Sequence, residues 1–432
     1  MHNNNLIYNR ANNLLLILVF CFPFIIVIGS AAINIATVLI SIITIHTIFK
    51  KEKKFFFENK LLILFFCFFL FIVLNAVFHY QSFGLLMKSI GNFRYLLLTI
   101  GVLFVLEKAN KKQITYFINI NLILIILICF DIIYQFLFYK NIFGFIPGMC
   151  SPDLSNCTRF SGVFEDELIA GAYIGQIGLL VFFLKMNLNF EKSNYLILGL
   201  FLLFFSTIII TGERNAFLIF ILTVFFIFIF LKKIKYIFYM SILLLSILAV
   251  FIQIDLSVKK RFFNFSSFTN SYLSSNNNFM HIIKNNPWVY HYEAATELFL
   301  EKPILGHGLK SFRVKCAKTS IEKKLLENRI YYKDYRACST HPHNYLLELL
   351  SEQGIFGGLF YISIILLVLF NIYKIIKKNN RKNRYILCTC IGSLILAIVF
   401  PLKPSGSFLT TFNAAILFYI FGFFIFYQKE IK

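Results

Sequence analysis

The sequence predicts an all-α polytopic membrane protein with about twelve transmembrane helices and one large loop late in the chain. The composition is 59% hydrophobic and only 14% charged, with a mean hydropathy of +0.75. Apolar runs such as LLLILVFCFPFIIVIGSAAINIATVLISII recur along the chain. Such a run can cross a hydrocarbon core of roughly 30 Å, which takes about 20 helical residues. Basic residues also gather in alternate connections, as membrane topology requires, so a soluble domain is excluded.

The apolar runs divide the chain into three parts. Residues 1–253 hold nine helices with short loops, 254–343 form the large loop, and 344–432 hold three helices and a tail. The predicted helices occupy residues 12–30, 31–49, 61–78, 93–107, 115–138, 166–186, 194–211, 216–232, 235–253, 344–373, 385–402 and 408–427. Arg10 before the first run is typical of a signal peptide, but a second run follows at once. An uncleaved anchor is therefore the preferred interpretation.

Basic residues predict the orientation of the helices. The basic connections carry Lys50, Lys51, Lys53, Lys54, Lys60, Lys108, Lys111, Lys112, Lys185, Lys192, Lys232, Lys233, Lys235, the run KIIKKNNRKNR and the tail QKEIK. The opposite short connections hold only Lys88, Lys140, Arg159, Arg214 and Lys403. Because basic short loops stay in the cytoplasm, both termini are predicted to be cytoplasmic and residues 254–343 periplasmic. The net charge of +22 largely reflects this bias and does not indicate nucleic-acid binding.

The large loop carries more positive charge than topology requires. It holds 14 Lys and Arg residues against 7 Asp and Glu residues. Long loops escape the positive-inside rule, so this excess is available for an anionic ligand. A solvated basic surface explains the same count, and both interpretations stay open.

The cysteines fall into two classes by location. Cys21, Cys67, Cys129, Cys388 and Cys390 lie in predicted spans and are typical small core residues. The outer loops hold two pairs, Cys150 with Cys157 and Cys316 with Cys338. An even number in each outer loop indicates two disulfides in an oxidising compartment, with free thiols as the alternative.

Polar residues gather near one boundary of the predicted bundle, where function is expected in a membrane protein. They are Asp131, Gln135, Glu165, Asp166, Glu167, Glu213, Arg214, His343 and Asn344. Arg214 lies in the tight turn TGERNAF, and its planar guanidinium matches the oxygens of a phosphate. The alternatives are an ion pair with Glu213, Asp166 or Glu167, or simple extension toward the membrane interface.

The segment THPHN predicts a helix start with a histidine beside it. Pro342 keeps His341 out of helical geometry, and Asn344 is a good N-cap, so the helix begins near His343 or Asn344. The positive end of the helix dipole disfavours an imidazolium at His343, and a neutral imidazole can accept a proton. The histidines could instead only cap the loop. A metal site of His341 and His343 with His307 or His291 has no supporting spacing.

Two further features surround this segment. Gly354, Gly357 and Gly358 would let a neighbouring helix approach closely. Within the large loop, residues 291–302 predict a short amphipathic helix that ends at Pro303, followed by the turn Gly306–Gly308 and Arg313. Its Leu298 and Phe299, with Leu305, are expected against the membrane surface or the bundle. The stretch KTSIEKKLLENRIYYKDYRAC is polar enough for a loop or a helix.

These motifs resemble those of the O-antigen ligase family. His343-Asn344, nine residues, then Gly354-x-x-Gly357 fits the family pattern His-Asn-x9-Gly-x-x-Gly. TGERNAF resembles the family's arginine-bearing turn, and KPILGHGLKSF resembles its proline–glycine loop. The match extends in outline to the whole chain, and the cysteines around HPHN resemble a subgroup feature. The resemblance implies a GT-C-like architecture in the bacterial inner membrane, with the active site facing the periplasm.

The resemblance also implies a reaction. A glycan on undecaprenyl pyrophosphate would pass to a sugar hydroxyl of lipid A-core with inversion, without metal or other cofactor. His343 would be the general base, Arg214 would bind the pyrophosphate, and His341, Asn344 and Glu213 would support them. Gly354 and Gly357 complete the motif.

One departure from the family pattern concerns a second arginine, expected before the aromatic-rich helix. No arginine lies between Arg261 and Arg313 here, so Arg313 or His291 would substitute. A polysaccharide polymerase of the same family is an alternative that the sequence does not separate from a ligase. A twelve-span solute transporter is a more distant one, since we find no half-to-half similarity.

Overall fold

We describe the chain from a computed structural model that covers residues 2–50, 59–80, 82–150, 157–188, 194–254, 262, 287–327, 337–377 and 383–429. Extended structure in these ranges is limited to one isolated bridge between Met149 and Arg159. All other regular structure there is helical. The predicted all-α polytopic membrane fold is therefore confirmed.

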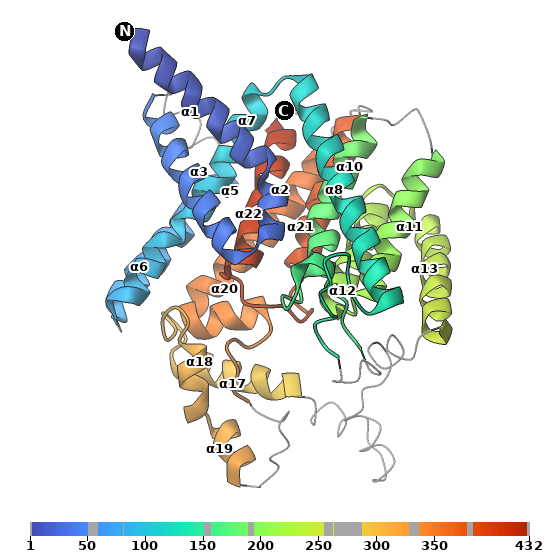
Figure 1. Cartoon of the computed structure of the whole chain (residues 1–432). Coiled ribbons are helices and arrows are strands. Elements are labelled where there is room, and N and C mark those ends of the chain that lie inside the picture. Colours follow the sequence, from blue (N-terminus) through green and yellow to red (C-terminus); the bar gives the residue numbers. More distant parts are fainter. Residues whose placement is uncertain are drawn as a thin grey trace.

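Most helices stand side by side in one bundle, and the two termini lie at the same end (Figure 1). The first half of the chain forms α1 (His2–Phe20), α2 (Phe22–Ile28), α3 (Ser30–Lys50), α5 (Lys60–Phe78), α6 (Phe83–Gly91), α7 (Phe93–Lys108), α8 (Lys111–Phe138), η1 (Gly162–Phe164), α9 (Ala170–Tyr173), the π-helix η2 (Ile174–Gly178) and α10 (Leu179–Leu188). The second half forms α11 (Asn194–Ile210), α12 (Arg214–Phe230), α13 (Ile234–Ile254), α17 (Pro287–Glu301), α18 (Phe312–Lys315), η3 (Cys316–Lys318), α19 (Ser320–Glu327), α20 (Tyr345–Lys377), α21 (Asn383–Ile398) and α22 (Thr411–Lys429). The helices α17, α18 and α19 lie beyond the other end, next to the start of α20 (Figure 1).

All twelve predicted spans fall on helices, but the number that can cross a membrane is smaller. By length and composition, eight helices in the described ranges are long and apolar enough, or nine if the bent pair α1 and α2 is one span. The first span was predicted as one helix over residues 12–30, whereas the structure divides it into two helices at an angle of 61°, with the break before Phe22. Pro23 stands in the first turn of α2, where a missing N–H costs nothing. α11, α12 and α21 are apolar but shorter.

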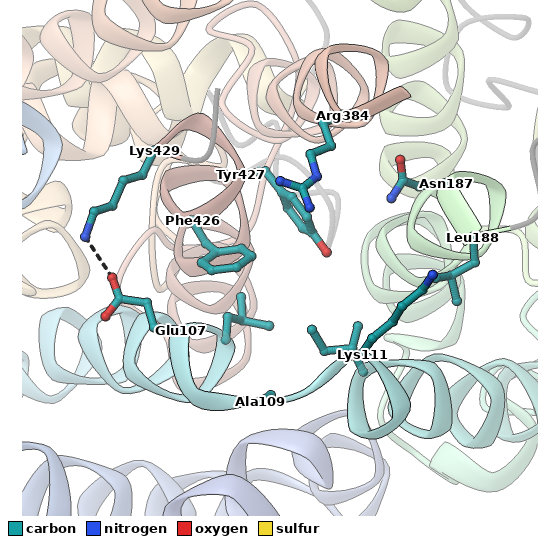
Figure 2. A pocket seen from close by; sticks show the side chains of 11 residues that line it. Glu107, Ala109, Lys111, Asn187, Leu188, Arg384, Phe426, Tyr427 and Lys429 are labelled. Atoms are coloured by element: carbon teal, nitrogen blue, oxygen red, sulfur yellow. Dashed lines mark hydrogen bonds and ion pairs between the residues drawn. The ribbon is translucent and has the colours of Figure 1, made fainter. Parts of the chain in front are cut away.

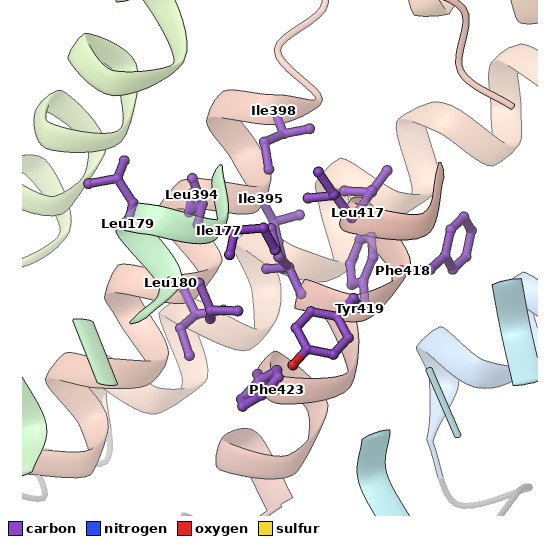
Figure 3. Close-up of a cluster of buried hydrophobic side chains, with 14 of the residues drawn as sticks. Ile177, Leu179, Leu180, Leu394, Ile395, Ile398, Leu417, Phe418, Tyr419 and Phe423 are labelled. Carbon is purple, nitrogen blue, oxygen red and sulfur yellow. The ribbon is translucent and has the colours of Figure 1, made fainter. Parts of the chain in front are cut away.

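α22 lies at the centre of the bundle, and α13 lies at its edge. The apolar window of α22 is 83% buried, against 11% for that of α13. α22 packs along α7, α21 and α3, and α12 packs along α21. Figure 3 shows Ile177 and Leu180 meeting Ile395 of α21 and Tyr419 of α22 in one buried cluster. Such all-round burial explains why α22 is apolar on every face.

α20 is two helical pieces joined at Gly354, whose φ of +65° is non-helical. A Cβ at Gly354 would lie 2.2 Å from the carbonyl oxygen of Ile304, and one at Gly357 would lie 2.5 Å from that of Leu349. The prediction that these glycines admit a neighbouring helix is therefore wrong. They admit the loop at Ile304 and the first piece of α20 itself, because the kink folds that piece back.

The helix predicted within the large loop also differs from its prediction. It begins at Pro287 rather than near His291 and ends at Glu301, just before Pro303. Leu298 is buried with Phe312 in a small cluster of the loop region itself. Part of KTSIEKKLLEN is helical, as α19. The predictions for Lys51, Lys53, Lys54 and Lys192, for 255–261 and 263–286, and for 378–382 lie outside the described residues.

Candidate functional site

The start of α20 holds His343 in an unusual backbone conformation. Its φ is +56°, which is left-handed and uncommon for a residue with a side chain. Asn344 is the N-cap, since its Oδ1 accepts a hydrogen bond from Leu347 N at 3.1 Å. Ser405 N donates to His343 O at 2.8 Å, and Asn344 Nδ2 donates to Pro401 O at 2.7 Å. The loop 400–410 between α21 and α22 therefore fixes the histidine.

Three histidines meet at this point. The ring centroid of His343 lies 4.2 Å from that of His341 and 5.3 Å from that of His291 on α17. His291 Nδ1 is 2.9 Å from Ala337 O, so this nitrogen carries the proton and donates. His341 Nε2 is buried without a partner among the described residues. We name these residues the histidine cluster.

Burial keeps the histidine cluster neutral near pH 7. Burial, and then the charge of His291, lowers the pKa of His343. A hydrogen bond to the Ser405 backbone raises this pKa but does not offset the other two effects. Burial, followed by the charges of His343, His291 and Arg313, lowers the pKa of His341 to about 4. Burial also lowers the pKa of His291. A neutral imidazole at His343 is the form that accepts a proton.

Metal ligation has no geometric support in the described part of the chain. No three His, Cys, Asp or Glu side chains converge there as ligands. Metal independence stays a prediction.

Arg214 is the first residue of α12, directly after a buried turn. The Glu213 carboxylate accepts hydrogen bonds from Gly171 N at 2.8 Å and Ala172 N at 3.1 Å, at the start of α9. These contacts secure the turn, so Glu213 supports the position of Arg214. Burial, and then the positive charge of Arg159, lowers the pKa of the Arg214 guanidinium. Arg159 follows the bonded pair Cys150–Cys157, and the sequence indicated only an outer-loop charge there.

Lys403, which the sequence analysis counted only as a loop charge, is buried at 3% exposure. Its Nζ lies 3.1 Å from Asn215 Oδ1 and 5.1 Å from the ring centroid of Tyr345. Asn215 follows Arg214, and Tyr345 is two residues after His343. Burial lowers the pKa of Lys403 to about 7. The only sequence signal was its place between two prolines in PLKPSGSF.

Arg313, the predicted second phosphate-binding residue, comes from the large loop. It is an exposed residue of α18, and its charge acts on His341. It also acts on Lys310, whose pKa is lowered first by burial and then by Arg313 and Lys88. The pair Cys316–Cys338 is bonded and links this region to the segment before His341.

The proline–glycine loop docks on the kink of α20 through its backbone. His307 N donates to Ser351 O at 3.1 Å, Gly308 N to Glu352 O at 2.8 Å, and Ile355 N to Pro303 O at 2.7 Å. The buried Glu352 carboxylate accepts from Lys310 N and Phe312 N, while that of Glu348 accepts from Ser407 Oγ and Phe408 N. The first piece of α20 thus joins both loops that surround the histidine cluster.

Two polar residues expected at the boundary have a local structural role. Asp131 and Gln135 are buried at 2% and 0% exposure. Asp131 Oδ1 accepts from Ile142 N, and Gln135 Oε1 accepts from Gly162 N. They hold the loop that carries Arg159.

A cavity of about 640 Å³ lies away from all these residues. It is at the end of the bundle that holds the C-terminus, between the ends of α7, α8, α10, α21 and α22. Figure 2 shows Arg384, Tyr427 and Lys111 around it and the ion pair of Glu107 with Lys429, which measures 2.9 Å. None of the predicted site residues lines it.

The comparison with protein families agrees with the position of the histidine cluster. Residues 199–362 match the family described as O-Antigen ligase. This segment is similar to an O-antigen ligase domain. It includes Arg214, Arg313 and the whole motif from His343 to Gly357, so the predicted resemblance is confirmed. Arg159 and Lys403 lie outside the matched segment. No curated protein matches the chain.

The chain is a multi-pass membrane protein, and the matched segment supports a function of the O-antigen ligase or polymerase type. Members of this family are membrane enzymes that act on lipid-linked polysaccharide.

Proposed function

We propose that the protein transfers a glycan from undecaprenyl pyrophosphate to a sugar hydroxyl of lipid A-core, with inversion and without a metal. One observation carries this proposal. Within the matched segment, burial keeps His343 neutral at the start of α20, and Arg214 begins α12. Lys403, from outside that segment, contacts Asn215 next to Arg214 and Tyr345 next to this helix start. A base next to a group of cations suits a reaction that removes one proton and releases one anion.

The chemistry follows from these roles. His343 takes the proton of the acceptor hydroxyl as its oxygen forms a bond to the anomeric carbon. The bond from that carbon to the pyrophosphate oxygen breaks, and its electron pair leaves with the pyrophosphate. Attack opposite the leaving group inverts the configuration. The fork of Arg214 donates hydrogen bonds to the departing oxygens and stabilises the charge that grows on them.

The topology supports a reaction on the periplasmic side of the inner membrane. The histidine cluster lies at the opposite end of the bundle from the termini and from the cavity with Lys111, Arg384 and Lys429. Basic helix ends are typical of the cytoplasmic side. The oxidising side then holds both bonded cysteine pairs, as their chemistry requires.

Gel analysis of lipopolysaccharide and of lipid-linked glycan in a deletion strain tests the proposal. Loss of a ligase should leave rough lipopolysaccharide and polymer on the carrier lipid, and wild-type protein should restore the ladder. Single repeats on the core would instead identify the polymerase of the same family. An unchanged ladder and an unchanged carrier lipid pool would contradict both.

A further inference from the structure

Lys403 is a buried cation whose contacts offset only part of the free-energy cost of burying its charge. Its ammonium contacts an amide oxygen, Asn215 Oδ1, and the face of Tyr345. Among the described residues, no carboxylate lies within ion-pair distance of it. A lysine is almost never fully buried unless it is paired. An aromatic face contributes about 0.5–2 kcal/mol, which is less than the several kcal/mol that burying an ion costs.

The low pKa of the side chain, about 7, shows the consequence of this burial. Near this pH the amine is divided between its charged and neutral forms, and a nearby anion would favour the charged form. The protein therefore keeps a costly group in a place where an apolar side chain would be more stable. A buried charge without a partner of opposite sign is typical of a binding site for a charged ligand.

The loop 400–410 brings Lys403 into contact with the two helix starts that carry the predicted functional groups. On one side, Nζ meets Asn215, the neighbour of Arg214 in the first turn of α12. On the other side, it lies over Tyr345, and Ser405 of the same loop holds the carbonyl of His343. The helix starts of α12 and α20 are thus joined by one lysine.

We propose that Lys403 binds the donor pyrophosphate together with Arg214 and is the second cation that the leaving group needs. The inference rests on the proposed function and adds a residue to its donor site. Arginine grips phosphate oxygens with a planar fork, whereas lysine contributes a compact charge with three donors. When the bond to the sugar breaks, the ammonium donates to a pyrophosphate oxygen that gains the electron pair.

Binding measured on purified protein tests this assignment. The variants are Lys403→Met, which keeps the length but not the charge, and Lys318→Met, an exposed lysine of η3, as the matched control. The probes are farnesyl pyrophosphate and inorganic pyrophosphate, titrated by calorimetry in detergent. Because Lys403→Met loses a charged hydrogen bond, its Kd for both probes should rise by about tenfold or more. Lys318→Met should bind like the wild type.

Thermal unfolding without a probe separates ligand binding from a structural role. If Lys403 is kept for the ligand, Lys403→Met should melt at the wild-type temperature or above, because it removes a buried charge. If Lys403 only tethers Asn215 to the loop, the variant should lose stability or fail to fold. That result would overturn the inference.

The remaining outcomes are also decisive. If the wild type binds the probes and Lys403→Met binds them with the same Kd, this inference is overturned and the proposed function is not affected. His343→Ala should bind both probes normally while transfer is lost, which keeps binding and chemistry apart. A wild-type protein that transfers no glycan and binds neither probe overturns the proposed function and this inference together.

Discussion

Replacing His343 with glycine separates the chemistry of the imidazole from the shape of the backbone. The left-handed φ of +56° at His343 costs an ordinary residue about 1–2 kcal/mol and costs glycine nothing. Glycine in turn loses about 0.5–1 kcal/mol more entropy on folding. The His343 carbonyl and the Asn344 side chain keep their contacts with Ser405 and Pro401, while the hydrogen bond of the imidazole to the Ser405 backbone is lost. That loss costs about 0.5–1.5 kcal/mol, so His343→Gly should unfold within about 2 kcal/mol of the wild type.

Transfer should nevertheless collapse in this variant. A positioned general base contributes about 10²–10⁴-fold to the rate, which is roughly 3–5 kcal/mol of transition-state stabilisation. The assay is glycan transfer in vitro with purified protein, a lipid pyrophosphate donor and lipid A-core, resolved on gels. Added imidazole should restore part of the rate, because the variant leaves room next to His341 and His291.

His341→Ala is the matched control for this experiment. His341 precedes Pro342 and lies in the same cluster, but its pKa of about 4 makes it a poor base. The His341→Ala variant should lose less transfer activity than His343→Gly, and chelators should not reduce the rate of transfer. Transfer near the wild-type rate by a folded His343→Gly would refute the assignment of the base. A strongly destabilised His343→Gly would refute the backbone argument.

Four further predictions follow from the same geometry. Arg214→Lys should lose most transfer while keeping the charge, because lysine lacks the planar fork; full activity of a normally expressed variant would contradict this. The pKa of His343 is lowered from 6.5, so the base stays neutral above that pH, and the acid limb of kcat/KM should lie below pH 6.5 rather than above it. Gly354→Ala places a Cβ 2.2 Å from a loop carbonyl at a φ of +65°, so thermal unfolding should show a loss of at least about 1–2 kcal/mol, and an unchanged midpoint would refute the kink. Peptide mass spectrometry without reductant should show Cys316 bonded to Cys338, and serine at both should cost about 3 kcal/mol of stability, whereas free thiols in the native protein would exclude the bridge.

The sequence predicted the helical framework well because hydropathy depends on composition along the chain. Each predicted apolar run became a helix, and Pro342 with Asn344 located the start of α20. The bend before Phe22 and the early start of α17 at Pro287 were missed. Proline is tolerated in the first turn of a helix, so the same residue can end one helix or begin another.

Glycine roles were harder to predict than glycine positions. Gly354 and Gly357 were expected to receive a neighbouring helix, as small residues do in membrane bundles. The structure instead brings the loop at Ile304 against Gly354 and the carbonyl of Leu349 against Gly357. Spacing alone does not distinguish a helix-packing face from a kink, since both need the space that a missing Cβ leaves.

The polar residues divide in the same way. Asp131, Gln135 and Glu213 were grouped with the functional candidates. Asp131 and Gln135 proved to accept hydrogen bonds from the backbone of a loop, and Glu213 from the backbone at the start of α9. In a low-dielectric bundle an irregular loop must satisfy its backbone groups internally, and buried carboxylates and amides do this. Polarity near a membrane boundary therefore marks both the site and the loops that position it.

The cations next to the candidate base show why the rest of the site could not be predicted. Arg214 was found because a tight turn fixes its place in any fold, whereas Lys403 and Arg159 look like ordinary loop charges in the sequence. Lys403 meets Asn215 across 188 positions of the chain, and this contact depends on α12 packing along α21. In the sequence this lysine indicates only topology, but in the fold it is a buried charge that a bound anion would stabilise. Since the contact is made by tertiary packing alone, only the fold could bring this second cation against the residue that follows Arg214.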